Sequence, residues 1–161
     1  MISFNSEDIV FNLKNKTKLK NWVVSTIEKH PPRSSGSIRA GKKKAGDISF
    51  VFCSDAFLLE MNKEYLNHDT YTDIITFDYS KSESEQFPLK KGVRGISGDI
   101  FISIDRVKEN ASSFSKTFED ELHRVMIHGV LHLLGYKDKT KIAKAEMRKQ
   151  EDLCLKALSK I

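Results

Sequence analysis

Two histidines one helical turn apart, followed by a glycine and an aspartate, form a candidate metal site. His128 and His132 are four residues apart, so on a helix they would lie about 40° apart around the axis and roughly 6 Å apart along it. Gly135 allows the positive-φ residue that ends a helix and turns the chain back, which would return Asp138 as a third ligand. Two imidazoles and one carboxylate with an open fourth position suit zinc. The spacing therefore predicts one Zn²⁺ per chain, bound by His128, His132 and Asp138.

Two other interpretations of this motif stay open on the sequence alone. The first is a buried helix end with two hydrogen-bonded histidines, which would explain the apolar neighbours of the pair but not the positions of Gly135 and Asp138. The second is a metallopeptidase, because metzincin peptidases share the histidine pair, the glycine and the third ligand at these offsets. Those peptidases have a catalytic glutamate where this chain has Gly129, which argues against efficient peptide hydrolysis. If Asp138 is not a ligand, Glu146 and His68 are the next candidates.

Three blocks of the sequence occur in the order seen in one known protein family. They are Asn62–Phe77, Gly98–Ser103 and residues 128–136, which read His-Gly-Val-Leu-His-Leu-Leu-Gly-Tyr. On these blocks the chain resembles the YbeY (UPF0054) family, bacterial metal-dependent endoribonucleases associated with ribosomal RNA maturation. The resemblance covers most of the chain and implies an enzyme that cleaves phosphodiester bonds in single-stranded RNA. It also implies RNA as a partner, together with the ribosome or ribosomal proteins.

The chain departs from the family pattern in two regions. The family's third zinc ligand is usually histidine, and this chain has Asp138 there, with Lys137 at the usual aspartate position. Aspartate binds zinc through oxygen, so we expect the site to be retained with one more negative charge and a less electrophilic metal. Leu66 stands where the family has an arginine implicated in activity. This second departure keeps open a non-catalytic alternative, a zinc-containing ribosome-assembly factor.

Length, charge and cysteine content fit a cytoplasmic protein. The chain has 161 residues, which favours a single domain over residues 1–161. Its net charge of +5 and its pI of about 9.1 permit an acidic partner such as RNA. No apolar run of about 18 residues predicts a membrane span, and no signal peptide is evident. Cys53 and Cys154 are too few and too far apart in sequence for a disulfide framework.

Apolar periodicity predicts an α/β (α+β) fold. We expect an early strand or two within residues 2–13 and further strands at 48–53, 73–79 and 99–104. Helical spacing and cap residues predict helices over 17–30, from a cap at Ser54 or Asp55, from a cap at Asp105 to about Phe114, over 118–134 and over 141–158. Loops are expected over 33–46 and 80–97. The pattern predicts a mixed sheet of about four strands covered by helices, with the metal site at the end of a core helix.

Catalytic candidates outside the metal ligands are Arg124, His68 and Asp73. Arg124 lies one turn before His128, where its side chain would reach a phosphate, a nearby carboxylate or Asp120. His68 and Asp73 belong to a family block and could handle protons or orient a ligand, although a solvated histidine and a turn aspartate are the plainer interpretations. A bound zinc ion would lower the pKa of its water towards roughly 7 or polarise a phosphoryl oxygen.

Two basic stretches are candidates for contact with the RNA backbone. Arg39–Lys44 and Lys90–Arg94 both lie in expected loops, where solvated charge is the alternative interpretation. We expect a positive surface around the metal if these loops border it. His123 falls on a different helix face from the histidine pair and is not expected to be a ligand. His30 ends a helix, where a cation is favourable.

Overall fold

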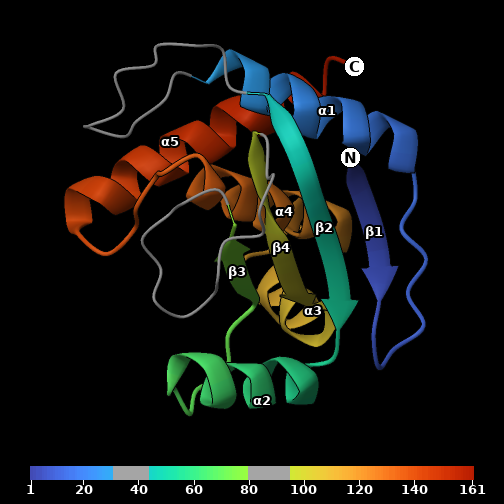
Figure 1. Cartoon of the computed structure of the whole chain (residues 1–161), viewed down its shortest axis with the longest axis vertical. Coiled ribbons are helices and arrows are strands. Elements are labelled where there is room, and N and C mark those ends of the chain that lie inside the picture. Colours follow the sequence, from blue (N-terminus) through green and yellow to red (C-terminus); the bar gives the residue numbers. More distant parts are fainter. Residues whose placement is uncertain (31–43, 80–94) are drawn as a thin grey trace.

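The computed structural model describes residues 1–30, 44–79 and 95–161 of the chain. In these ranges, strands and helices alternate along much of the sequence (Figure 1). They are β1 (Ile2–Ser6), α1 (Lys16–Lys29), β2 (Ala45–Cys53), α2 (Asp55–Leu66), β3 (Ile74–Asp78), β4 (Ile96–Ser103), α3 (Ile104–Ser113), α4 (Phe118–Leu133) and α5 (Lys141–Leu158). None of the helices in these ranges is long and apolar enough to cross a membrane. The predicted α+β class is confirmed.

As predicted, the four strands form one mixed sheet. Their order in the sheet is β1-β2-β4-β3. β1 and β4 both run parallel to β2, and β3 runs antiparallel to β4. Residues 2–13 contain one strand, and Ile9 and Phe11 pack against the core from the segment that follows it. The expected loop through residue 97 was wrong at its end, because Ile96 already pairs with Ala45 of β2.

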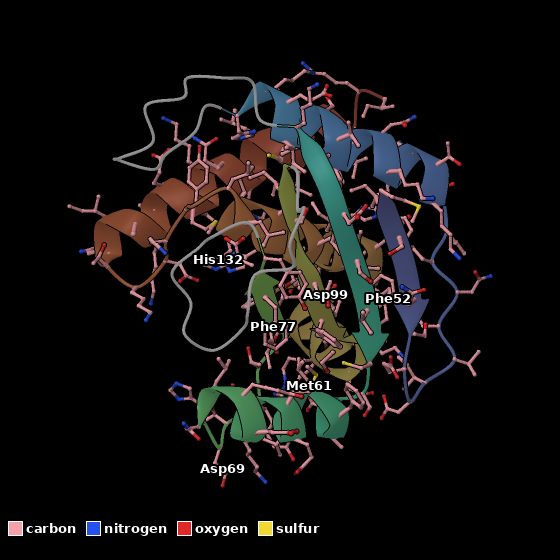
Figure 2. The ribbon with its side chains drawn as sticks, viewed as in Figure 1. Phe52, Met61, Asp69, Phe77, Asp99 and His132 are labelled. Atoms are coloured by element: carbon pink, nitrogen blue, oxygen red, sulfur yellow. The ribbon has the colours of Figure 1, made fainter. Side chains whose placement is uncertain are left out.

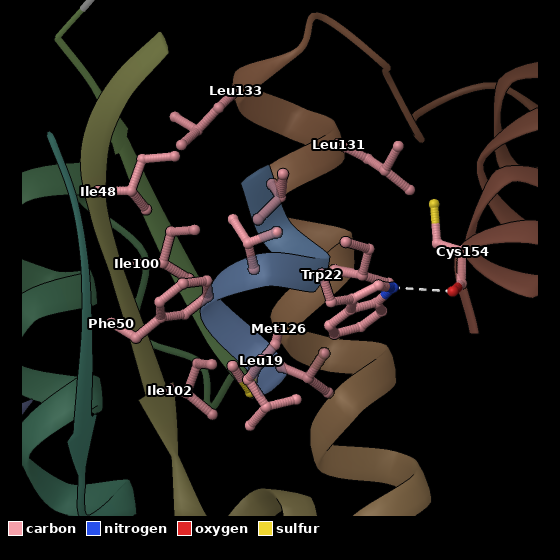
Figure 3. Close-up of a cluster of buried hydrophobic side chains, with 14 of the residues drawn as sticks. Leu19, Trp22, Ile48, Phe50, Ile100, Ile102, Met126, Leu131, Leu133 and Cys154 are labelled. Atoms are coloured by element: carbon pink, nitrogen blue, oxygen red, sulfur yellow. Dashed lines mark hydrogen bonds between the residues drawn. The ribbon is translucent and has the colours of Figure 1, made fainter. Parts of the chain in front are cut away.

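The main hydrophobic core lies between one face of the sheet and the helices α1, α4 and α5 (Figure 3). Phe50 of β2 and Ile100 of β4 contribute to it from the sheet, and Met126 contributes from α4. Trp22 of α1 is buried, and its indole N–H donates a hydrogen bond of 2.9 Å to the carbonyl oxygen of Cys154 in α5. The helix that carries the histidine pair is therefore packed on both the sheet and its neighbouring helices.

Side chains that alternate with this core lie on the opposite face of the sheet. Cys53, Ile75 and Phe77 form a smaller buried cluster there with Leu58 of α2. In Figure 1, α2 crosses below the sheet and leads through a short connection into β3. This connection contains two of the catalytic candidates, His68 and Asp73.

The start of α3 differs from the expected cap. Ser103 caps the helix, since its hydroxyl oxygen accepts a hydrogen bond of 3.1 Å from the N–H of Arg106. The expected cap, Asp105, lies in the first turn, and its carboxylate instead accepts a hydrogen bond of 2.9 Å from the N–H of Asp55 at the start of α2. The prediction of Asp105 as the cap was wrong because this carboxylate serves a neighbouring helix. Of the two expected candidates for the cap of α2, Ser54 and Asp55, the structure shows Ser54.

Candidate metal centre

α4 carries both histidines near its C-terminal end. Thr117 fixes the start of the helix, because its hydroxyl oxygen accepts a hydrogen bond of 3.1 Å from the N–H of Asp120. In the last two turns of the helix, His128 and His132 face each other, with their Nε2 atoms 2.9 Å apart. Figure 2 labels His132 on α4, the helix that packs against the edge strand β3. The predicted pairing of the two imidazoles across one helical turn is confirmed.

A tight turn after α4 brings an aspartate back to the histidines. Gly135 has a φ of +96°, and its N–H donates to the carbonyl oxygen of His132 at 2.9 Å. The N–H of the buried Tyr136 donates to the carbonyl oxygen of Leu131 at 3.0 Å. These two bonds form the Schellman motif that closes many helix C-termini. As predicted, the turn returns Asp138, whose Oδ2 lies 3.3 and 3.4 Å from the two histidine Nε2 atoms.

The donor set fits a tetrahedral metal ion. Its three interatomic distances are 2.9, 3.3 and 3.4 Å, and ligand atoms placed about 2.0–2.1 Å from a tetrahedral zinc lie about 3.3 Å apart. Within the described residues, His128, His132 and Asp138 are the one group of such side chains close enough to share an ion. Their side chains are 22%, 27% and 38% exposed. Three protein ligands with access to solvent are typical of catalytic zinc sites, whereas structural sites are closed by four.

The outer nitrogen of each imidazole is held by a hydrogen-bond acceptor. His128 Nδ1 lies 2.7 Å from Oε1 of Glu151, and His132 Nδ1 lies 3.0 Å from the carbonyl oxygen of Tyr136. A neutral imidazole that donates from Nδ1 has its lone pair on Nε2. Both histidines are therefore oriented, and in the tautomer needed, to bind a metal through Nε2.

Glu151 is itself held by an arginine. It is buried on α5, and its Oε2 lies 2.9 Å from Nη1 of Arg124, whose Nη2 lies 2.8 Å from Oδ1 of Asp152. Arg124 thus pairs with two carboxylates of α5 in place of Asp120. Burial alone would lower the pKa of His128, but the hydrogen bond and the charge of Glu151 outweigh it and raise this pKa. Burial and the charge of His128 lower the pKa of His132, which favours its neutral, ligating form.

Gly129 allows α4 to pack closely against the sheet. A Cβ atom at this position would lie 2.8 Å from Cγ2 of Ile100 and 2.9 Å from Cδ1 of Ile74, both of which are too short for real contacts. A glutamate side chain would need far more room than this Cβ atom. The packing of the helix on β3 and β4 therefore disfavours a glutamate, the catalytic residue of metzincins, at this position.

Comparison with known proteins assigns the chain to a family. The family model described as Endoribonuclease YbeY matches residues 2–159 of the chain. The chain belongs to the YbeY family. Relatives named Endoribonuclease YbeY include that of Flavobacterium psychrophilum, which is 47% identical over 97% of this chain and 95% of the relative. That of Cytophaga hutchinsonii is 43% identical over 96% of this chain and 93% of the relative. The resemblance inferred from the three sequence blocks is confirmed.

A solved structure is also similar over nearly its whole length. It is the solution structure of a Thermotoga maritima protein that is 25% identical in sequence to this chain. The superposition covers 99% of this chain and 93% of the Thermotoga chain, with a TM-score of 0.53. The likeness supports the fold described for this member of the YbeY family.

The structure places the two departures from the YbeY family pattern on the surface. Leu66, where the resemblance led us to expect an arginine, is the last residue of α2 and is 37% exposed. Lys137 is exposed beside the half-buried Asp138 in the turn after α4. This member of the YbeY family therefore has a lysine next to its candidate carboxylate ligand and an apolar residue at position 66.

The remaining catalytic candidates differ in their relation to the metal centre. Asp73 is half-buried, and its Oδ2 accepts a hydrogen bond of 3.4 Å from Asn110. Burial raises the pKa of Asp73, and the nearby His128 opposes this shift. His68 is exposed in the connection after α2, and its N–H donates to the carbonyl oxygen of Asn62. The structure thus brings Asp73 close enough to the centre to interact with His128, whereas His68 is outside the ligand group.

The other histidines have partners away from the centre. His123 packs edge-on against Trp22 with ring centroids 6.1 Å apart, and burial lowers its pKa. His30 lies at the end of α1 with its Nδ1 2.7 Å from the carbonyl oxygen of Thr26. The expectation that His123 is not a ligand agrees with this placement. The basic residues 39–43 and 90–94 lie outside the described residues.

Sequence reasoning missed Glu151, the acceptor that orients His128. A signal for it was present, because Met147, Glu151, Cys154 and Leu158 recur at helical spacing and form the buried face of α5. A glutamate within an apolar stripe is costly to bury unless it is paired. Its partners, however, lie 23 and 27 residues earlier in the chain, so the spacing alone does not name them.

Proposed function

We propose that this protein is a zinc-dependent endoribonuclease that cleaves single-stranded RNA during ribosomal RNA maturation in the cytoplasm. The observation that carries the proposal is the solvent-accessible group of His128, His132 and Asp138, which offers three ligands and leaves a fourth position open. Membership of the YbeY family, with relatives named Endoribonuclease YbeY, supports RNA as the substrate. Ribosomal RNA as the target, and the ribosome or its proteins as partners, are part of the same proposal.

The protein's own residues have distinct roles in this scheme. A divalent cation held by the three ligands supplies a Lewis acid for phosphodiester hydrolysis. Glu151 fixes the ring of His128, and we assign Arg124 to positioning Glu151 because its guanidinium is committed to two carboxylates. Asp73 is the candidate for proton transfer, since burial raises the pKa of its carboxyl beside the centre. His68 is exposed and lies outside the ligand group, so we assign it no part in proton transfer.

The geometry bears on the two other interpretations of the motif. A metallopeptidase needs a glutamate where this chain has Gly129, which packs so closely on Ile100 that an added Cβ atom would lie only 2.8 Å from Cγ2 of Ile100. A purely structural zinc in an assembly factor would be expected in a closed, four-ligand site. Access of solvent to the ligand group favours the catalytic interpretation over the structural one.

Cleavage of ribosomal RNA by zinc-loaded protein tests the proposal. We expect wild-type protein to produce defined RNA fragments and His128→Ala to produce none. In His132→Ala, the bound metal should fall below one equivalent per chain. Metal content is measured on protein purified without a histidine tag. Wild-type protein that carries a full equivalent of zinc and leaves ribosomal RNA intact would contradict the endoribonuclease proposal.

A further inference from the structure

We propose that a row of exposed basic residues beside the metal centre binds RNA. These residues would contact the phosphates that neighbour the scissile phosphate at the metal. This inference rests on the proposed function and names the surface that the substrate would use. The row, called here the basic rim, follows the turn after α4 into the first two turns of α5 and consists of Lys137, Lys139, Lys141, Lys144 and Arg148.

Both parts of the basic rim, the turn after α4 and the start of α5, border the metal centre. Lys137 and Lys139 directly flank Asp138 in the chain, and both are exposed. On α5, Lys144, Arg148 and Glu151 recur at positions i, i+4 and i+7, which share one face of a helix. Glu151 contacts His128 from this face, and Arg148 Nη1 lies 3.7 Å from Glu151 Oε2. The basic side chains on this face of α5 therefore lie along the edge of the centre.

The acidic residues of this stretch are already occupied. Asp138 lies against the two histidines, and Glu146 accepts a hydrogen bond of 2.8 Å from Gln150. In the part of the chain that the structure describes, no carboxylate lies within ion-pair distance of the four rim lysines. By contrast, Arg124 pairs closely with two carboxylates. The charge of the basic rim is thus left largely uncompensated.

This placement of charge works against the stability of the free protein. The first turn of α5 contains no acidic residue, while that of α4 contains three. Lys141 and Lys144 therefore stand where the helix dipole disfavours a cation. Lys144 and Arg148 also form a like-charged pair at i, i+4, which is unfavourable on a helix. A bound anion would relieve both repulsions.

A nucleic-acid backbone is the anion that this arrangement fits. Lysine is a flexible point charge that binds phosphate without a fixed geometry, which suits exposed positions. Several such charges in a row suit a chain of repeated phosphates, and the row begins at a metal ligand. RNA bound along it would present one phosphate to the metal centre and its neighbours to the lysines.

The salt dependence of RNA binding tests the basic rim separately from catalysis. The probe is a short fluorescent oligouridylate, titrated into metal-free protein in the presence of a chelator so that no cleavage occurs. For Lys139→Gln, Lys141→Gln and Lys144→Gln combined, the slope of log K against log salt should fall by about 2, or about 0.7 for each phosphate that a lysine no longer neutralises. Zinc stoichiometry of this variant should stay at that of the wild type.

A matched control removes the same charge at the opposite end of the molecule. Lys14, Lys16 and Lys20 are exposed around the start of α1, and Figure 1 shows α1 starting at the right and α5 at the left. Their combined change to glutamine should leave the slope unchanged. An equal fall in both variants would show a general effect of net charge, and an unchanged slope in the rim variant would show that the rim does not bind RNA. Either result overturns the proposal.

Two further outcomes separate this inference from the proposed function. If the rim variant lowers the slope but zinc-loaded wild-type protein leaves RNA intact, the rim stands and the endoribonuclease proposal fails. If polyglutamate binds with the same lysine dependence and oligouridylate does not bind, the partner of the rim is an acidic protein and the inference is overturned.

Discussion

Replacing Glu151 with glutamine should weaken zinc binding by about 10- to 100-fold, the usual effect of losing an outer-shell partner of a metal-bound histidine. This corresponds to about 1.4 to 2.8 kcal/mol of binding free energy. The carboxylate accepts from His128 with one oxygen at 2.7 Å and from Arg124 with the other at 2.9 Å. An amide has one acceptor oxygen, so it satisfies only one of these two donors.

Both orientations of the amide are unfavourable. If its oxygen faces His128, its NH₂ group meets the guanidinium of Arg124, and two donors are placed in contact. If its NH₂ group faces His128, that histidine must accept through Nδ1 and carry its proton on Nε2, the atom needed for the metal. Because Glu151 is buried, water compensates poorly in either case.

Competition with a chromophoric chelator measures the zinc affinity, and nitrogen chemical shifts of the imidazoles report the tautomer of His128. The matched control is Asp152→Asn, because this more exposed carboxylate binds the same arginine without touching His128. We expect the control to bind zinc as the wild type does. Wild-type zinc affinity and an unchanged His128 tautomer in Glu151→Gln would refute the orienting role.

Three other predictions follow from the described geometry. Asp138→Ala should weaken zinc binding roughly 100-fold, a loss of about a quarter of the binding free energy of a structural zinc site. Asp138→His should retain zinc and shift the pH optimum for cleavage downwards, since a neutral ligand leaves the metal more electrophilic. Titration with zinc and a pH–rate profile check these expectations, and full metal occupancy of the alanine variant would exclude Asp138 as a ligand. Gly129→Ala should lower the free energy of unfolding by up to about 2 kcal/mol. Overpacking against Ile100 costs about 1–3 kcal/mol, and the gain in helix propensity offsets about 1 kcal/mol of this. Urea denaturation measures the change, and a variant more stable than the wild type would contradict the close approach of α4 to Ile100. Burial raises the pKa of Cys53 to about 12 and that of Cys154 to about 11 from an ordinary value of 9.0. Native protein should therefore resist thiol reagents at neutral pH, and its stability should fall as the pH rises above about 9, where the thiols of the unfolded chain ionise first. Rapid labelling of both thiols in folded protein would show that they are accessible and would contradict this expectation.

The sequence by itself determined the candidate metal ligands and the class of fold. The period of the α-helix brings His128 and His132 together, and the conformational freedom of Gly135 returns Asp138, so the whole ligand set depends on a segment of eleven residues. Helix positions followed from apolar spacing for the same reason, with α4 and α5 found within one residue of their predicted ends. Such features depend on neighbours in sequence, which spacing describes well.

Tertiary structure alone decided what supports those ligands. Glu151 reaches His128 from another helix, and Asp105 serves α2 instead of capping α3 because the starts of the two helices lie together. The role of Gly129 became clear only where α4 meets Ile100 on the sheet. Each of these contacts joins segments that are distant in the chain, and their proximity is set by strand order and core packing. A helical or strand period describes one element at a time, so it cannot specify which side chains of two elements meet.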